Sequence, residues 1–165
     1  MPINGIKQPE QLYVSPQLRL RRFNEIPQEA LEWYQDEDLV WLVDEVKNRY
    51  TPERLQAMYT YLDNHGELYI IEAFEGDAFI PIGDVTFWEE DMPIVIGNPE
   101  YRNRGVGKRV IETLIKRAKE LGFVSLSVSE IYDYNAASRR CFESVGFRIK
   151  EKTEKGVSFI MDLSV

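Results

Sequence analysis

Strand-like patterns recur along the chain, either as alternating hydrophobic and polar residues or as short runs of β-branched and aromatic residues. LRLRRF places basic residues between leucines, and FVSLSVS places serines between apolar residues. Such patterns predict strands at residues 18–23, 67–74, 78–88, 93–96, 123–129, 147–153 and 157–163. The turn sequences EGD and EKG are expected to join two neighbouring pairs of these strands into hairpins.

Helical patterns alternate with the strands. Thr51 is a suitable N-cap, and the helix that follows it is expected to end at the sequence NHG. Residues 106–121 repeat apolar side chains every three or four positions, and Asn135 is a suitable N-cap for a helix that ends at Gly146. Residues 27–46 have a helix-forming composition and predict one or two short helices.

The order of these elements is strand, helices, three strands, helix, strand, helix and two strands. This order predicts an α+β domain of three layers (α/β/α), in which helices cover a mixed sheet. The chain has 165 residues, which is enough for one domain, 1–165, with a substantial core.

The composition is that of a soluble globular protein, with 44% hydrophobic and 29% charged residues. No apolar stretch approaches the roughly 18 residues that a membrane span requires. The first residues, MPINGIKQPEQ, lack the charged start and apolar core of a signal peptide. We therefore expect a cytoplasmic protein that does not act at a membrane.

Charge and cysteine content narrow the choice of partners. The formal net charge of -8 argues against nucleic acid, because phosphates would be repelled, and it is compatible with a cationic small molecule. The single cysteine, Cys141, excludes an internal disulfide, and with only one histidine, His65, no metal site is expected. Because no histidine accompanies it, Cys141 is expected to be a buried free thiol rather than a nucleophile.

The segment NPEYRNRGVGKRV, residues 98–110, places two glycines where a helix should begin. Glycine weakens a helix by roughly 1 kcal/mol relative to alanine, so two glycines at this position need an explanation. Close approach of a ligand to the main chain would provide one. A P-loop would need Ser or Thr where Arg109 stands, and a dinucleotide fingerprint would need glycine in place of Val110. A bare helix N-terminus that binds a pyrophosphate fits better, with Arg102, Arg104 and Lys108 as cationic partners. The alternative is a tight turn with a basic surface.

The wider pattern resembles a known family. RNRGVG matches the R/Q-x-x-G-x-G/A motif of the GCN5-related N-acetyltransferases, and NAASRRCFESVGF is similar to their N-x-x-A/S…GF segment at a matching distance. The resemblance extends from about Phe79 to Phe147. The serine in NAAS, together with EWYQDEDLVWLV near the start, most resembles the branch that acetylates ribosomal-protein N-termini.

The resemblance implies a mostly antiparallel sheet of six to seven strands, splayed at its centre, with about four helices. Acetyl-CoA, as cosubstrate, would lie in the opening between the strands PIVIG and FVSLSVS. Its pyrophosphate would rest on residues 104–108, which include Gly105, Val106 and Gly107. The other contacts would come from Val95, Gly97, Asn135 and Ser138. The family often dimerises, so a homodimer is compatible with the resemblance.

Acetyl transfer requires that an ammonium loses a proton, that an oxyanion finds a donor and that a thiolate leaves. A backbone N–H near Val95 to Gly97 would serve as the donor. Glu89, Glu90 and Asp91 precede the central strand, where the family often places a carboxylate base, and Glu72 is a further candidate. The nearest position to the glutamate of the ribosomal branch is Met92, and these acids could equally form a solvated turn.

Many family members have a tyrosine acid at the position that Phe142 occupies here, and phenylalanine cannot donate a proton. Ser138 is the favoured substitute, with Tyr132 and Tyr134 as alternatives. Loss of the acid does not exclude activity, because a thiolate leaves readily when the thiol pKa is about 8.5.

Aromatic residues near the start of the chain, above all Trp33 and Tyr34, could line an acceptor pocket, although a place in the core is as consistent with helical spacing. The sequence thus predicts an acetyl-CoA-dependent N-acetyltransferase that acts on a primary amine by direct attack in a ternary complex. The amine would be a small cationic amine, an antibiotic or a protein N-terminus. A non-catalytic acyl-CoA-binding module and, from the glycines alone, a nicotinamide oxidoreductase are the alternatives.

Overall fold

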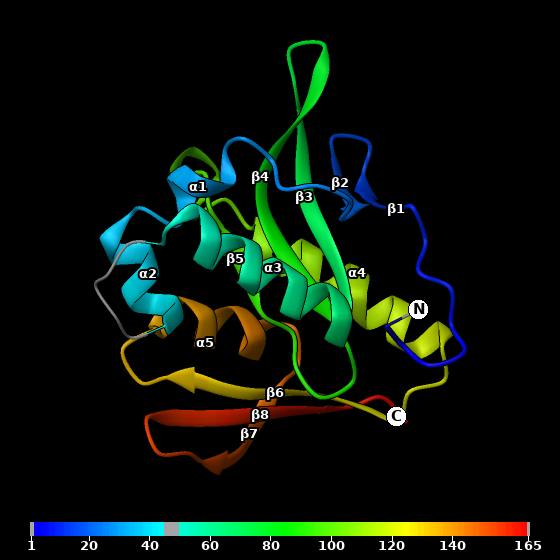
Figure 1. Cartoon of the computed structure of the whole chain (residues 1–165). Helices are drawn as coiled ribbons and strands as arrows, with labels where there is room; N and C mark the ends of the chain where they lie inside the picture. Colours follow the sequence, from blue (N-terminus) through cyan, green and yellow to red (C-terminus); the bar gives the residue numbers. More distant parts are fainter. Residues whose placement is uncertain (1, 45–49, 165) are drawn as a thin grey trace.

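The computed structural model describes residues 2–44 and 50–164. Antiparallel pairing builds one five-stranded sheet in the order β1-β2-β3-β4-β5 (Figure 1). Its strands are β1 (Gln11–Ser15), β2 (Leu18–Arg22), β3 (Glu67–Glu75), β4 (Ala78–Phe87) and β5 (Ile94–Ile96). The predicted hairpin around EGD is confirmed, because β3 and β4 pair along their whole length.

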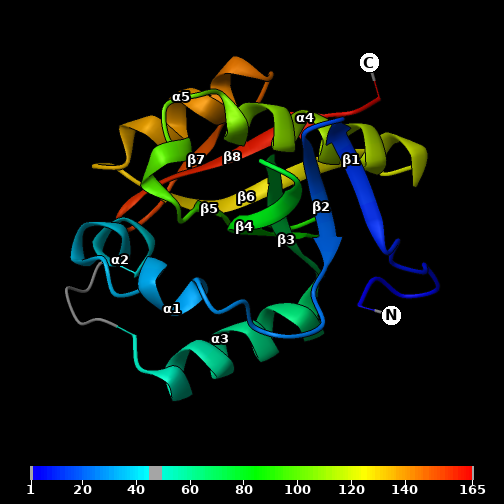
Figure 2. The same cartoon turned by 90° about the horizontal axis from the view of Figure 1, so that it is seen from above.

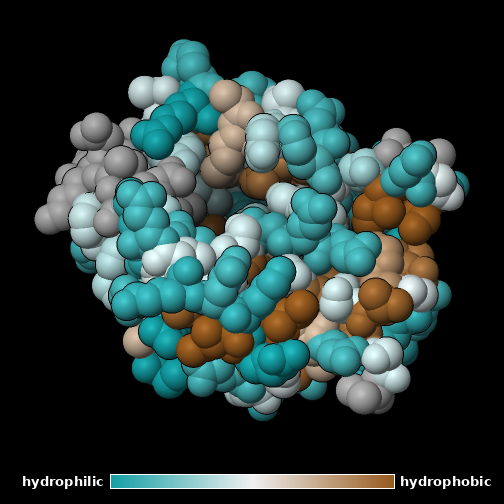
Figure 3. All heavy atoms as spheres, turned by 90° about the horizontal axis from the view of Figure 1, so that it is seen from below, coloured by the Kyte–Doolittle hydropathy of each residue, from teal (hydrophilic) through white to brown (hydrophobic). Residues whose placement is uncertain are grey.

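A second, three-stranded sheet has the order β6-β8-β7. It contains β6 (Ser125–Tyr132), β7 (Arg148–Lys152) and β8 (Gly156–Asp162). β7 is its outer strand and is exposed along its whole length. Figure 3 shows the molecule from this side, where hydrophilic residues cover most of the surface and hydrophobic patches lie between them.

The two sheets touch at one end and separate at the other. The N–H of Ser127 donates to the carbonyl of Glu89 (3.0 Å), and the N–H of Ser129 donates to Asp91 Oδ1 (3.1 Å). No ladder joins β5 to β6 among the described residues. The expected splay at the centre of the sheet is therefore present, between β5 and β6.

Helices cover both faces of the sheets, as Figure 2 shows, and give the three layers that the sequence predicted. One side carries α1 (Ala30–Trp33), α2 (Glu37–Asp44) and α3 (Pro52–His65). The other carries α4 (Val106–Glu120) and α5 (Ala136–Ser144), with the short 3-10 helix η1 (Pro99–Tyr101) before α4. None of the helices in the described ranges is both long and apolar enough to cross a bilayer.

The core has two parts, one on each side of the five-stranded sheet. The apolar row of α4 is fully buried, as predicted, and packs against the sheet with β6 and β8. The second part joins α1, α2 and α3 to β3 and β5. Both cores hold the edge strand β5 in place between α4 and α2.

Three details refine the predicted elements. The described residues form eight strands, because β1 was not expected: QLYVS is short and lies at the edge of the sheet. Segment 27–46 forms two separate helices as far as Asp44, and its last two residues lie outside the described ranges. The predicted N-caps are confirmed, since Thr51 Oγ1 accepts from Arg54 N (3.1 Å) and Asn135 Oδ1 accepts from Ser138 N (3.2 Å).

Candidate functional site

A cavity of about 530 Å³ lies where the two sheets separate. Its walls come from the free edge of β5, the starts of α4 and α5, and one side of α2. The cavity therefore brings together the two segments, RNRGVG and NAASRRCFESVGF, that the sequence singled out.

The start of α4 has no side-chain cap. Its N-cap, Gly105, has a φ of 76°, a left-handed conformation that glycine adopts readily, and no side chain bonds to the first turn. The first helical bond runs from Arg109 N to Gly105 O (3.2 Å). The N–H groups of Val106, Gly107 and Lys108 are therefore free of helical partners and carry the positive end of the helix dipole.

Packing does not explain the glycine at 107. A Cβ atom there would meet only Cys141 Sγ, at an ordinary 3.5 Å, and Gly107 has no positive φ. Beside Gly105 a Cβ would meet nothing within 4 Å. The space next to both glycines opens on the cavity, so a ligand phosphate could reach the main chain.

The edge of β5 offers main-chain groups to the same cavity. Gly97 N donates to Ile82 O (2.8 Å) and Thr86 N donates to Pro93 O (3.0 Å), which fixes the register with β4. Because hydrogen bonds alternate along an antiparallel ladder, Val95 bonds toward β4 while Ile94 and Ile96 direct their main-chain groups away from it. The N–H groups of these two isoleucines, rather than that of Val95, are thus the donors that face the cavity.

The predicted cations have different environments. Arg102 borders the cavity, but its guanidinium donates to the carbonyls of Ile96 (2.9 Å) and Gly97 (3.0 Å) and lies 3.7 Å from Asp36. Arg102 therefore holds the turn after β5. Lys108 is exposed and borders the cavity.

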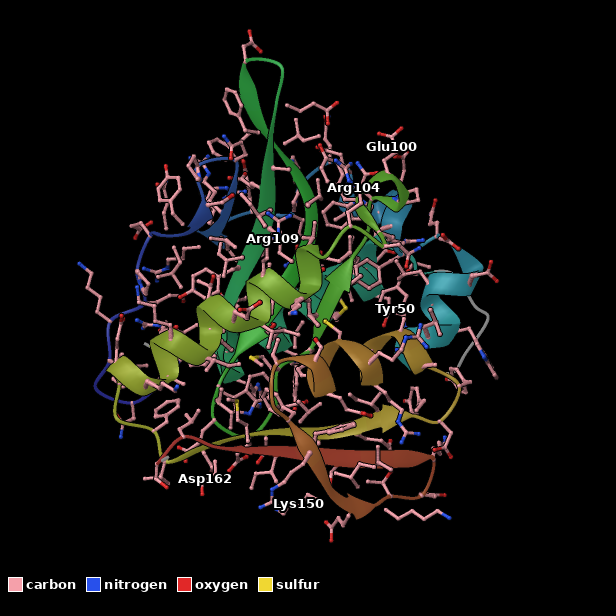
Figure 4. All side chains as sticks on the ribbon, turned by 180° about the vertical axis from the view of Figure 1, so that it is seen from behind. Tyr50, Glu100, Arg104, Arg109, Lys150 and Asp162 are labelled. Carbon is pink, nitrogen blue, oxygen red and sulfur yellow. The ribbon has the colours of Figure 1, made fainter. Side chains whose placement is uncertain are left out.

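Arg104 lies off the cavity. Its guanidinium donates to the carbonyl of Glu100 (3.1 Å) and sits 5.0 Å from the ring centre of Tyr101. Figure 4 shows Arg104 and Glu100 together beside the start of α4, with Arg109 on the first turn of the helix. Arg104 borders a separate cavity of about 190 Å³ beside the β1–β2 turn.

The start of α5 forms the opposite wall. Asn135 and Ser138 both border the cavity, and so does the buried ring of Phe142. Arg140 is a further cation on this wall, which sequence reasoning missed although it stands in the quoted SRRC stretch. Cys141 was expected to be buried, but it is half-buried and borders the cavity. Its partial burial raises the pKa of its thiol, which is typical of an unreactive cysteine.

The acids considered as bases lie away from the cavity lining. Glu89 and Glu90 are exposed in the turn before β5. Asp91 Oδ1 accepts from the N–H groups of Met92 (3.0 Å) and Ser129, which ties this turn to β6.

Glu72 is also occupied. Its two carboxylate oxygens each accept from an arginine at 2.8 Å, one from Arg19 and one from Arg21. Glu72 is buried and does not border the cavity.

Trp33 and Tyr34 are buried in the core between the helices and the sheet, and neither borders the cavity. The ring of Trp33 packs so closely on Gly97 that a Cβ there would lie 2.2 Å from the ring. Gly97 is consequently covered by Trp33, and it does not border the cavity either.

Sequence reasoning missed Asp84, a carboxylate inside β4 that is 2% exposed. Its Oδ2 accepts from the hydroxyls of Tyr34 (2.8 Å) and Tyr59 (2.9 Å). Burial raises the pKa of Asp84 to about 6, and the two hydroxyls limit the rise. The signal was present in AFIPIGDVTFW, where one charged residue interrupts an otherwise strand-forming run.

Comparison with known proteins identifies the class. A model of the acetyltransferase (GNAT) family matches residues 20–147, and the chain belongs to this family. The family resemblance read from the two motifs is thereby confirmed.

Two curated relatives match part of the chain. [Ribosomal protein bS18]-alanine N-acetyltransferase from Salmonella typhimurium is 31% identical over 91 residues, which are 53% of this chain and 61% of the relative. Protein SPT10 from Saccharomyces cerevisiae is 38% identical over 69 residues, which are 41% of this chain and 11% of that protein. The chain thus spans less than two thirds of either relative.

Solved structures share the fold at lower identity. A GNAT-family acetyltransferase from Bacillus anthracis has a TM-score of 0.72 at 19% identity, covering 90% of this chain and 96% of its own. AAC(6')-Ib in complex with ribostamycin and coenzyme A has a TM-score of 0.67 at 17% identity, covering 88% and 93%. These similarities confirm the α+β architecture.

Proposed function

We propose that the protein transfers the acetyl group of acetyl-CoA to a primary amine, by direct attack of the amine in a ternary complex. The observation that carries the proposal is the uncapped, glycine-bearing start of α4, which opens on a cavity bounded by the free edge of β5. Free N–H groups on the first turn of α4 suit a pyrophosphate. The N–H groups of Ile94 and Ile96 suit an extended amide chain such as pantetheine.

The residues that line the cavity would have different roles. Gly105, Val106, Gly107 and Lys108 would hold the pyrophosphate, while Asn135 and Arg140 border the space beside it. Acetyl-CoA supplies a thioester carbonyl, which is activated when a β5 N–H donates to its oxygen. Ser138 borders the cavity and is the hydroxyl available to protonate the leaving thiolate.

The proposed acceptor is a cationic amine, as in the curated N-terminal acetyltransferase and as the net charge of -8 favours. Asp38 on α2 borders the cavity and offers it a carboxylate, which supports an ammonium there. The same charge argues against a nucleic acid partner.

The experiment is thiol release from acetyl-CoA, followed with a thiol-reactive dye. Amines to be tested are spermidine, kanamycin, an alanine-initiated peptide and free amino acids. We expect turnover at least tenfold above hydrolysis with one of them. Hydrolysis alone with the whole panel would contradict the proposal.

A second candidate is a non-catalytic acyl-CoA-binding module, favoured by one observation. Phe142 borders the cavity and is buried, so no hydroxyl stands where the family's tyrosine acid would be. This candidate predicts saturable binding of CoA by calorimetry with no turnover of any amine.

A further inference from the structure

Three carboxylates are buried in the described part of the chain, and only two of them face a cation. Glu67 accepts from Arg117 at 2.6 Å, and Glu72 accepts from two arginines at 2.8 Å. Asp84 has two tyrosine hydroxyls as partners, and no basic side chain among the described residues contacts it. An uncompensated buried charge costs stability, so it points to a functional role.

Asp84 stands directly behind the cavity wall. Its register partner on β5 is Val95, which borders the cavity. Leu39 of α2 also borders the cavity and belongs to the same packed cluster as Val95, Tyr34 and Tyr59. The end of the cavity near α2 is therefore backed by a buried carboxylate.

The groups that face Asp84 are few. Tyr34 directly follows α1 and Tyr59 comes from α3, while the register partner on β3 is the apolar Ile70. Tyr50 packs against Tyr34, with ring centres 5.0 Å apart. Both tyrosine hydroxyls donate to Oδ2, and among the described residues no hydrogen bond reaches Oδ1. Oδ1 therefore keeps its lone pairs for another proton donor.

We propose that Asp84 is the proton acceptor for the amine, an assignment that rests on acetyl transfer as the proposed function. Because Asp84 stands behind the cavity wall and does not itself border the cavity, the ammonium R–NH₃⁺ gives one proton to Oδ1 through a bridging water, and the resulting amine attacks the thioester carbonyl. The C–N bond forms first to give the oxyanion, the C–S bond then breaks, and the second amine proton passes through the Ser138 hydroxyl to the departing thiolate to give CoASH. Asp84 then returns its proton to water, so the reaction releases one proton overall.

The pH profile tests this assignment. The acid limb of kcat against pH, at saturating amine and acetyl-CoA, is expected near the pKa of Asp84. Tyr34→Phe and Tyr59→Phe each remove a hydrogen bond that stabilises the carboxylate, so each should move the limb upward by roughly half a pH unit or more. Asp84→Asn should lower kcat by about 10²- to 10⁴-fold and remove the limb. The acceptor amine itself titrates in the same way with every variant, so it does not shift the limb from one variant to another.

Tyr69→Phe is the matched control. Tyr69 is also a buried tyrosine that donates to a buried carboxylate, Glu67 (2.9 Å), but that carboxylate is paired with Arg117 and neither residue borders the cavity. This variant should leave the acid limb where it is. Thermal melting and CoA binding of every variant show whether the fold persists, and the tyrosine variants carry the test if Asp84→Asn does not fold.

The outcomes separate the two proposals. An upward shift in both tyrosine variants, with none in the control, supports Asp84 as the proton acceptor. Turnover whose acid limb is unchanged in these variants overturns the role of Asp84 and leaves acetyl transfer standing. CoA binding without turnover of any amine overturns acetyl transfer and the role of Asp84 together.

Discussion

The start of α4 lines one part of the cavity and α2 lines another, and these two ends of the cavity offer different chemistry. At the α4 end the groups that we propose to act are main-chain N–H groups, which are uncovered because Gly105 provides no side-chain cap and Gly107 carries no side chain. Behind the α2 end the group that we propose to act is a side chain, Asp84, which two tyrosines hold in the core.

The difference shows how each end could recognise charge. Main-chain donors at a helix start bind an anion without a counter-ion of their own, and they stay hydrated until it arrives. A buried carboxylate is already desolvated before any ligand binds. It therefore favours a cation or a proton strongly, but it destabilises the fold as long as it is charged and unpaired.

The largest effect concerns stability and pH at the Asp84 end. The folded pKa of about 6 lies above the unfolded value of 3.8, so the folded chain binds the proton more tightly. The contribution of Asp84 to the free energy of unfolding is then present below pH 4 and is lost as the pH rises through 6. The loss is about 3 kcal/mol in total. Urea unfolding from pH 4 to 7 gives the free energy of unfolding of the wild type and of Asp84→Asn, and the difference between the two measures this loss. A difference that does not change with pH would contradict the prediction.

The next prediction concerns the α4 end. Gly107→Glu places a carboxylate where the pyrophosphate would lie, and loss of two or so charge-assisted bonds should weaken CoA binding about 100-fold. The fold should persist, because the added Cβ meets only Cys141 Sγ at 3.5 Å. Calorimetry with CoA and thermal melting check both. Ala136→Glu, on the first turn of α5, is the matched control and should bind CoA normally.

A smaller effect is expected from the one cation that reaches this end from α4. Lys108→Ala removes a single exposed ammonium, so CoA affinity should fall by about fivefold to tenfold, and less at high salt. Lys116→Ala, two turns further along the same helix, should leave the affinity unchanged. Equal losses in both variants would mean that only the overall charge matters.

The smallest effect separates the two helix starts. Asn135 caps α5 through Ser138 N, whereas α4 has no cap. Asn135→Ala should therefore reduce the free energy of unfolding by about 1 kcal/mol. The matching change Gly107→Ala should preserve or raise stability while weakening CoA binding. Chemical unfolding and CoA calorimetry on both variants check this contrast.

The α4 end could be predicted from the sequence because its determinants are contiguous. Gly105 and Gly107 are separated only by Val106 in a single motif, and the helix pattern after them fixes where the first turn begins. The N-caps Thr51 and Asn135 could be predicted for the same reason, because each directly precedes its helix in the sequence.

The Asp84 end could not be predicted, because its three residues meet only in the folded chain. Tyr34, Tyr59 and Asp84 come from two helices and a strand, and their spacing in the sequence carries no common signal. The local contacts of the arginines could not be predicted either. Arg102 and Arg104 were expected on a phosphate, and in the structure their guanidinium groups donate to nearby main-chain carbonyls.

The outer strand β7 has a consequence for how copies of the protein meet. RIKEK presents four charged side chains in five exposed residues, along the edge where the three-stranded sheet ends. An edge of this kind discourages intermolecular strand pairing, because a second strand would have to bury those charges against its own. The charged residues of β7 thus protect this exposed sheet edge from aggregation.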